Sequence, residues 1–171
     1  MATEKGVTAL NAEAIAGPDR FEKFLGAGAL VILAAMSAAI LRGMPEWDRI
    51  PPMVWIHLAT IAVAVALTPV ILWQRRGTRR HRTLGYVWVA AMALTALDSL
   101  FIRLTNPGGF SVIHLLSIWT MIQVPIIVMS ARRHDARRHR SAVRGMVFGA
   151  LLIAGFFTFP FDRLLGHWLF G

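Results

Sequence analysis

Residues 56–88 read "IHLATIAVAVALTPVILWQRRGTRRHRTLGYVW". A continuous apolar run passes through a proline, ends in a cluster of arginines and gives way to a second apolar run. Because the apolar residues do not alternate with polar ones, the pattern indicates α-helices and not the strands of a membrane barrel. Each run approaches the roughly 17 to 25 residues that a helix needs to cross a bilayer. The stretch therefore predicts two membrane-spanning helices joined by a basic loop.

The same apolar character extends over most of the 171-residue chain, which is 56% hydrophobic and only 16% charged. A soluble domain carries about a quarter charged residues. We therefore expect an all-α, polytopic membrane protein with a single transmembrane domain over residues 26–171. Five apolar runs define the expected transmembrane helices: residues 26–43, 52–74, 84–104, 110–130 and 145–161.

Residues 113–149 repeat the pattern of residues 56–88, reading "IHLLSIWTMIQVPIIVMSARRHDARRHRSAVRGMVFG". In both units a histidine follows an isoleucine, a proline lies 12 or 11 residues further on, and Arg-Arg-His-Arg precedes the next apolar run. Membrane proteins are often built from duplicated units that survive only as weak internal symmetry. The repeat predicts that the second to fifth helices are a duplicated helical hairpin forming a four-helix bundle.

Positive charge is concentrated in two connections. The net charge is +9, and 11 of the 18 lysine and arginine residues lie in the loops after the second and fourth apolar runs. By the positive-inside rule both loops are cytoplasmic, which puts the N-terminus inside and the C-terminus outside. Residues 1–25 are then a cytoplasmic lead-in, in which "GPDRFEKFLG" (17–26) is a candidate amphipathic helix on the membrane surface. The arginines favour anionic lipid headgroups as partners and not nucleic acid.

Cysteine is absent from the chain. This excludes disulfides, iron–sulfur clusters, thiolate metal sites and covalently attached haem. The sequence also contains no nucleophile–base pair, phosphate-binding loop or paired-carboxylate motif, so hydrolase chemistry has no support. Any cofactor or metal must be held by histidine, carboxylate, methionine or the backbone.

Histidines and an aspartate at matched depths are the candidate functional residues. The expected helix limits place His57 and His114 roughly 8 to 9 Å below the outer interface, and Asp98 at a similar depth. Ionisable side chains inside the bilayer are costly and are therefore candidates for function. His81 and His139 lie at the opposite, cytoplasmic level. The sequence thus predicts one histidine pair for each side of the membrane.

The outer pair, His57 and His114, has two interpretations. Two neutral imidazoles at one depth could ligate a b-type haem or a metal ion. Alternatively, each could donate a hydrogen bond to a neighbouring helix, which stabilises packing by about 1 kcal/mol. Their matched position in the repeat favours ligation. For the inner pair, His81 and His139, the Arg-rich interfacial sequence favours a packing or solvated role, although neighbouring arginines could bind haem propionates.

Asp98 has three interpretations. It could complete a metal site with His57 and His114, or accept a hydrogen bond from one imidazole and fix its tautomer. It could equally form an ion pair near the outer surface with an arginine, the candidates being Arg42, Arg49 and Arg103. The tryptophans of the outer half are expected to form an interfacial belt, which comprises Trp47, Trp55, Trp119 and Trp168.

Four motifs together resemble a family of bacterial membrane proteins of unknown function called DUF2306. They are "RRGTRRHRTLGYVW", "GFSVIHLLSIWT", the "HR" of "ARRHRSAVRGM" and "IAGFFTFPFDRLLG". The similarity covers about residues 50–171. That family carries His-Arg at the starts of two helices, which matches His81-Arg82 and His139-Arg140 here. The resemblance implies a role for the inner pair but no particular reaction.

A more distant similarity is to cytochrome b561, in which two haems are held by histidines paired between the second and fourth and between the third and fifth helices. The four histidines that fall on those helices, in chain order, are His57, His81, His114 and His139. This similarity implies haem b as the cofactor.

The leading hypothesis is a bacterial inner-membrane, b-type cytochrome-like protein that passes electrons between a membrane quinol and an acceptor. His57 and His114 would be the outer haem ligands, with His81 and His139 as a further, inner pair. One alternative is a non-catalytic accessory subunit of a larger membrane complex that binds lipid. The other alternative is a membrane protein with a histidine-based metal site.

Overall fold

The structure is a computed structural model that describes residues 17–102, 112–160 and 163–171. The described residues form seven α-helices, a 3₁₀ helix and a π-helical segment, and none of them lies in a strand. The all-α prediction is therefore confirmed. The elements are α2 (Arg20–Arg42), η1 (Met44–Arg49), α3 (Pro52–Trp73), α4 (Arg79–Ser99), α5 (Val112–Arg132), α6 (Ala136–Met146), η2 (Val147–Ile153), α7 (Ala154–Phe156) and α8 (Leu164–Phe170).

Among the described residues, three helices are long and apolar enough to cross a membrane: α2, α3 and His114–Arg132 of α5, with mean hydropathies of 2.3, 2.1 and 1.6. The third predicted span corresponds to α4, which opens with three arginines in its first turn and carries Asp98 near its end. The fifth is not one regular α-helix, because the π-helical segment η2 separates α6 from α7. Length and composition therefore indicate a membrane protein, while the count of five spans stays a prediction.

A capping box fixes the N-terminal end of α2. The Asp19 carboxylate accepts a hydrogen bond from the Glu22 backbone N–H (2.9 Å), and the Glu22 carboxylate accepts one from the Asp19 N–H (3.2 Å). Most of the residues predicted to lie on the membrane as an amphipathic helix are instead the first turns of α2. The expected boundary at residue 25 falls inside this helix, because the capping box starts it before the apolar run begins.

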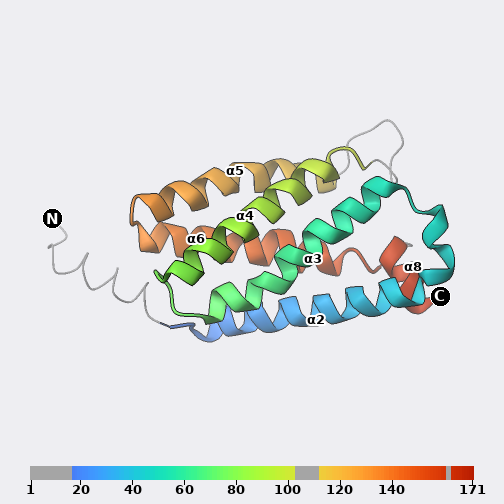
Figure 1. Ribbon diagram of the computed structural model, residues 1–171, viewed down its shortest axis with the longest axis horizontal. Coiled ribbons are helices and arrows are strands. Elements are labelled where there is room, and N and C mark those ends of the chain that lie inside the picture. Colours follow the sequence, from blue (N-terminus) through green and yellow to red (C-terminus); the bar gives the residue numbers. More distant parts are fainter. Residues whose placement is uncertain (1–16, 103–111, 161–162) are drawn as a thin grey trace, which may run out of the picture.

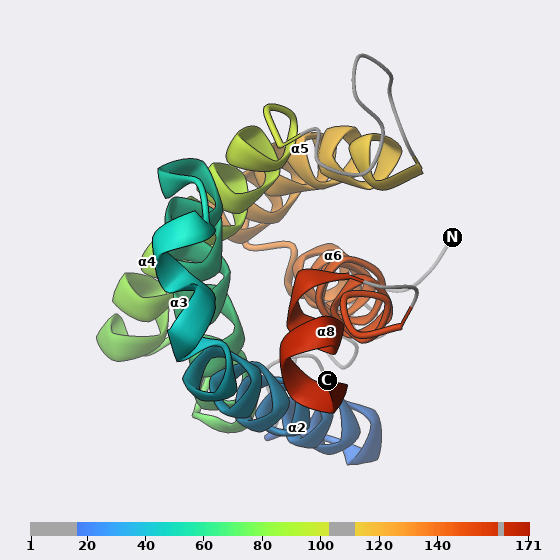
Figure 2. The same ribbon diagram turned by 90° about the vertical axis from the view of Figure 1, so that its right-hand side faces the viewer.

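The long helices form a ring in chain order (Figure 1, Figure 2). α2, α3, α4 and α5 follow one another around an arc, each packed against the next, and α6 with η2 returns between α5 and α2. α8 packs across α2 near the C-terminus. Within the arc α4 lies between α3 and α5, so the helices that carry His57 and His114 each pack on α4.

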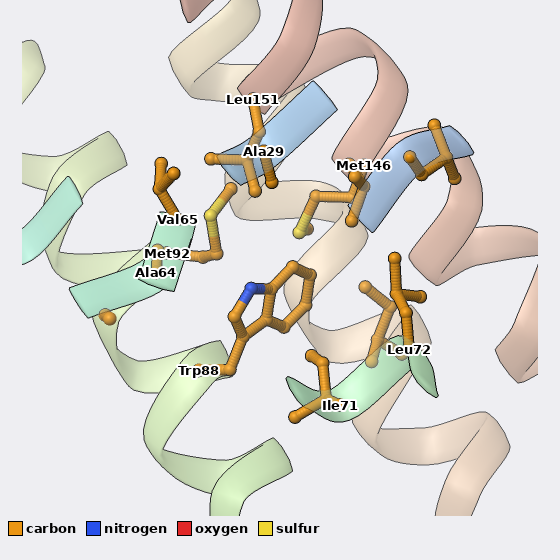
Figure 3. Close-up of a cluster of buried hydrophobic side chains, with 13 residues drawn as sticks. Ala29, Ala64, Val65, Ile71, Leu72, Trp88, Met92, Met146 and Leu151 are labelled. Carbon is orange, nitrogen blue, oxygen red and sulfur yellow. The ribbon is translucent and has the colours of Figure 1, made fainter. Parts of the chain in front are cut away.

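The middle of the ring is filled around Trp88 (Figure 3). This side chain is 1% exposed, and its indole N–H donates to the Thr68 hydroxyl (3.0 Å), which in turn donates to the Ala64 carbonyl (2.8 Å). The chain of hydrogen bonds satisfies the indole N–H where water does not reach it. Met92 and Met146 pack in the same cluster. Together with other buried apolar residues they form a packed layer between the helices, which we call the Trp88 layer.

At one end of the bundle, the start of α2 meets the connections between α3 and α4 and between α5 and α6 (Figure 1). There Glu22, 1% exposed, binds three arginines, a group that we call the arginine clamp. Arg140 donates from Nε to Oε1 (2.8 Å) and from Nη2 to Oε2 (3.0 Å). Arg144 donates from Nε to Oε1 (3.2 Å), and Arg76 donates to Oε2. The clamp therefore joins three segments that are distant in sequence.

The opposite end is closed by packed tryptophans. Trp47 and Trp55 pack edge to face with ring centroids 5.1 Å apart, and the centroid of Trp168 lies 6.3 Å from that of Trp55. Trp168 is 5% exposed, and a Cβ at Gly43 would lie 2.1 Å from its ring, so glycine is needed at that contact. The predicted interfacial belt is therefore wrong for Trp168, because the short α8 returns it to the interior.

We expect Glu22→Ala to lower the free energy of unfolding by about 3 to 5 kcal/mol, because it leaves three largely buried guanidinium groups without their carboxylate. The measurement is unfolding of the purified protein in detergent. Asp48→Ala is the control, since Asp48 is an exposed carboxylate of η1. Equal stability of the two variants would contradict a central role for the clamp.

Candidate functional site

Two cavities lie on opposite sides of the layer around Trp88. The outer cavity, toward the end closed by tryptophans, has a volume of about 120 Å³, and Met92 is part of its wall. The inner cavity, toward the arginine clamp, has a volume of about 530 Å³, and Trp88 is part of its wall. Pockets that hold drug-sized ligands or cofactors measure about 300 to 1,000 Å³. Of the two, the inner cavity has that size.

The inner cavity lies between α4, α5 and α6. His81, in the first turn of α4, and His139, near the start of α6, both line it. Apolar side chains such as Ile127 form part of the wall, and two exposed arginines, Arg82 and Arg132, line it as well. The structure therefore brings the inner histidine pair together around one cavity with cations beside it.

The two inner histidines are held differently. Nδ1 of His139 lies 3.0 Å from the Ile127 carbonyl oxygen. Since a carbonyl can only accept, Nδ1 carries the proton and donates, which leaves a lone pair on Nε2. Nδ1 of His81 lies 3.5 Å from the side-chain nitrogen of Gln74, a long contact that restrains its tautomer weakly. The Thr78 hydroxyl, at the N-cap of α4, accepts from the His81 backbone N–H (3.1 Å) and fixes the start of the helix.

Burial lowers the pKa of both inner histidines, which lie outside the predicted spans. The charges of His139 and Arg76 lower the pKa of His81 further. Arg76 also lowers the pKa of His139, although the hydrogen bond to Ile127 acts in the opposite direction. Both imidazoles are therefore neutral at physiological pH, which is the form that ligates a metal ion or accepts a hydrogen bond.

In the outer half of the ring, His57 of α3 pairs with Asp98 of α4. Nδ1 of His57 donates to Oδ1 of Asp98 at 2.6 Å, and the Thr60 hydroxyl donates to Oδ2 at 3.1 Å. Asp98 is buried, and the Ser99 hydroxyl lies 3.3 Å from the same His57 nitrogen. Of the three interpretations of Asp98, the structure shows the hydrogen bond to an imidazole. We call His57 and Asp98 the outer dyad.

The other two interpretations of Asp98 are not formed by the described residues. The aspartate makes no ion pair with Arg42 or Arg49, and Arg103 lies outside the residues that the structure describes. Within the described ranges, no group of three histidine, aspartate or glutamate side chains could hold a metal ion. The predicted metal site of two histidines and one carboxylate is therefore not assembled.

His57 and His114 are not placed alike. His57 lines the outer cavity, whereas His114 is buried in α5 and is not among the lining residues. The cavity of about 120 Å³ is close to the roughly 150 Å³ that holds a single benzene ring in a protein interior. A four-ring porphyrin does not fit a space of that size. The outer cavity therefore does not support a haem between His57 and His114.

Glu22 is the most important residue that sequence reasoning misses. The Asp19-x-x-Glu22 spacing before an apolar run is the signal of a capping box and could have located the helix start. Nothing in the sequence indicates that Glu22 binds Arg76 and Arg140, 54 and 118 residues away. The two remaining histidines, His134 and His167, are exposed.

No protein-family model, no curated protein and no solved structure matches this chain. The resemblances to DUF2306 and to cytochrome b561 therefore stay predictions.

The outer dyad is testable by a double-mutant cycle with His57→Ala, Asp98→Ala and the double variant. We expect a coupling free energy of about 1 to 3 kcal/mol, because either single change leaves a buried partner without its hydrogen bond. His167 and Glu46 are the control pair, since they lie 3.6 Å apart, His167 is exposed and Glu46 is only half-buried. Their coupling should stay below about 1 kcal/mol. A coupling for His57 and Asp98 no larger than the control would contradict the dyad.

Proposed function

We propose that the protein is an inner-membrane, b-type cytochrome-like electron-transfer protein whose haem lies in the inner cavity, ligated by His81 and His139. One observation carries this proposal. Both imidazoles line the same cavity of about 530 Å³, next to two exposed arginines. The sequence alone favours the outer pair. The small volume beside His57, and the commitment of that histidine to Asp98, move the proposal to the inner pair.

The inner residues fit the roles that such a site needs. The hydrogen bond from His139 Nδ1 to the Ile127 carbonyl orients the ring and leaves Nε2 as the ligating atom, an arrangement common for histidine ligands. Arg82 and Arg132 line the cavity and would supply guanidinium groups for the two propionates. Trp88 and Ile127 give the cavity an apolar wall on one side. A haem with two histidine ligands supplies one-electron transfer when it is bound.

A five-span bundle is part of the same proposal. The third and fifth predicted spans carry exposed apolar side chains: Val87, Leu94 and Leu97 on α4, and Phe148, Ile153 and Phe156 along η2 and α7. Such side chains suit contact with lipid. Both Arg-rich connections lie at the end where α2 begins, and α8 lies at the other end (Figure 1). This supports a cytoplasmic N-terminus, a periplasmic C-terminus and a duplicated hairpin formed by α3–α4 and α5–α6.

A second candidate function is that of a lipid-binding accessory subunit. It is favoured by the arginines that stay exposed at the inner end outside the clamp: Arg75, Arg79, Arg80, Arg82, Arg132, Arg133, Arg137 and Arg138. An exposed cluster of this kind attracts anionic headgroups of the cytoplasmic leaflet. The leading proposal involves a quinone as a further partner. The accessory-subunit candidate involves a larger membrane complex.

The haem proposal predicts a red protein with a Soret band and a reduced-minus-oxidised difference spectrum, when it is purified from cells supplied with a haem precursor. His139→Ala should abolish the signal, because it removes the ligand whose second nitrogen is held by Ile127. His114→Ala should retain it, and His167→Ala is the control for loss of an exposed histidine. A colourless wild-type protein would contradict the proposal. Loss of the signal in His114→Ala but not in His139→Ala would move the haem to the outer half.

The topology predicts that reporter fusions after Arg80 and after Arg137 are cytoplasmic, because both sites lie in the Arg-rich first turns of α4 and α6. A fusion after Asp48, in the connection at the opposite end, should be periplasmic. Reporters that respond to each compartment would measure this. Periplasmic exposure of either Arg-rich connection would contradict the orientation.

A further inference from the structure

We propose that the outer cavity is a binding site for a small phenol, a single aromatic ring that carries a hydroxyl group. The site uses the outer dyad and lies on the far side of the Trp88 layer from the proposed haem. It therefore does not depend on haem binding.

The size and lining of the cavity set the size and character of the ligand. Its volume of about 120 Å³ is close to that of a protein cavity of roughly 150 Å³ that binds benzene. Most of its wall is apolar, with Ile32, Met36, Leu58, Ile61 and Met92 among the lining residues. An apolar wall around a volume of this size suits one flat ring better than a cluster of water molecules.

The polar atoms of the wall determine which group the ring must carry. The hydroxyls of Ser99, Thr120 and Thr158 each donate to the carbonyl four residues earlier on their own helix, at 2.6, 2.9 and 3.0 Å. Their remaining capacity is to accept. His57 donates from Nδ1 to Asp98, so its Nε2 is an acceptor too. A wall that offers mainly acceptors selects a ligand that donates, and a phenol is a strong O–H donor.

Thr95 gives a second, independent indication of a ligand. It lines the outer cavity and is 8% exposed, and its hydroxyl has no hydrogen-bond partner among the residues that the structure describes. A buried hydroxyl without a partner costs about 1 to 3 kcal/mol. A phenol oxygen that donates to His57 can accept from Thr95, which removes this cost. The side chain of His57 keeps 28% of its surface exposed, so the dyad can be reached from outside the ring.

The test is a ¹⁹F NMR titration of the purified protein in detergent with 4-fluorophenol, compared with fluorobenzene, which has the same ring but no hydroxyl. We expect saturable binding of 4-fluorophenol, about tenfold tighter than that of fluorobenzene, as one buried hydrogen bond supplies. His57→Phe should reduce the affinity for 4-fluorophenol to that for fluorobenzene. His167→Phe, at an exposed position, should leave the difference unchanged.

A cavity-filling variant separates binding in the cavity from partition into the micelle. Ala154 lines the cavity, so Ala154→Leu should abolish saturable binding of both compounds. Ala66→Leu is the matched control, because Ala66 is exposed on α3. The proposal is overturned if 4-fluorophenol gives the same response in wild type and Ala154→Leu. It is also overturned if fluorobenzene binds as tightly as 4-fluorophenol. Neither outcome bears on the difference spectrum of the inner cavity.

Discussion

The carboxylate of Glu22 lies among the guanidinium groups of Arg76, from the connection between α3 and α4, and of Arg140 and Arg144, from α6. Three cations gathered at one end of a bundle repel one another unless an anion lies between them. A buried ion pair adds little net stability, because desolvation offsets the attraction, but the loss of one partner is costly. We infer that the clamp selects one arrangement of the helices, because it favours closure of the ring with α6 and η2 against α2.

The clamp also sets the rotation of α6. Arg140 follows His139 directly, and consecutive residues of an α-helix point about 100° apart. With Arg140 turned toward Glu22, His139 is turned toward the Ile127 carbonyl of α5. Arg76 and Arg140 are also part of the wall of the inner cavity. The shape of that cavity therefore depends on a carboxylate that does not line it.

Local sequence features were enough to predict the long apolar helices but not the cavities between them. Continuous apolar runs give α2, α3 and α5, and the bond between His57 and Asp98 was one of three interpretations open for that aspartate. The positive-inside rule only counts the arginines of each connection. It therefore does not distinguish an arginine that binds Glu22 from one that faces water. The volume of each cavity depends on how the side chains of several helices pack together. Because the two volumes differ, we propose the inner histidine pair as the haem ligands, whereas equal depth in the membrane favours neither pair.

The residues around Trp88 lie between the two cavities. Helix α4 contributes to both cavities. Its Thr95 lines the outer cavity, and its His81 lines the inner cavity. Between them Trp88 and Thr68 use their hydrogen bonds on each other and on the backbone, and apolar side chains fill the rest of the cluster. A proton or metal ion crossing this layer would lose its solvation without gaining a partner, at high cost. Ion transport through the ring would require Trp88 to move, whereas binding on each side requires no such change. The haem site and the phenol site that we propose would therefore lie on separate sides of this layer, with no continuous path between them.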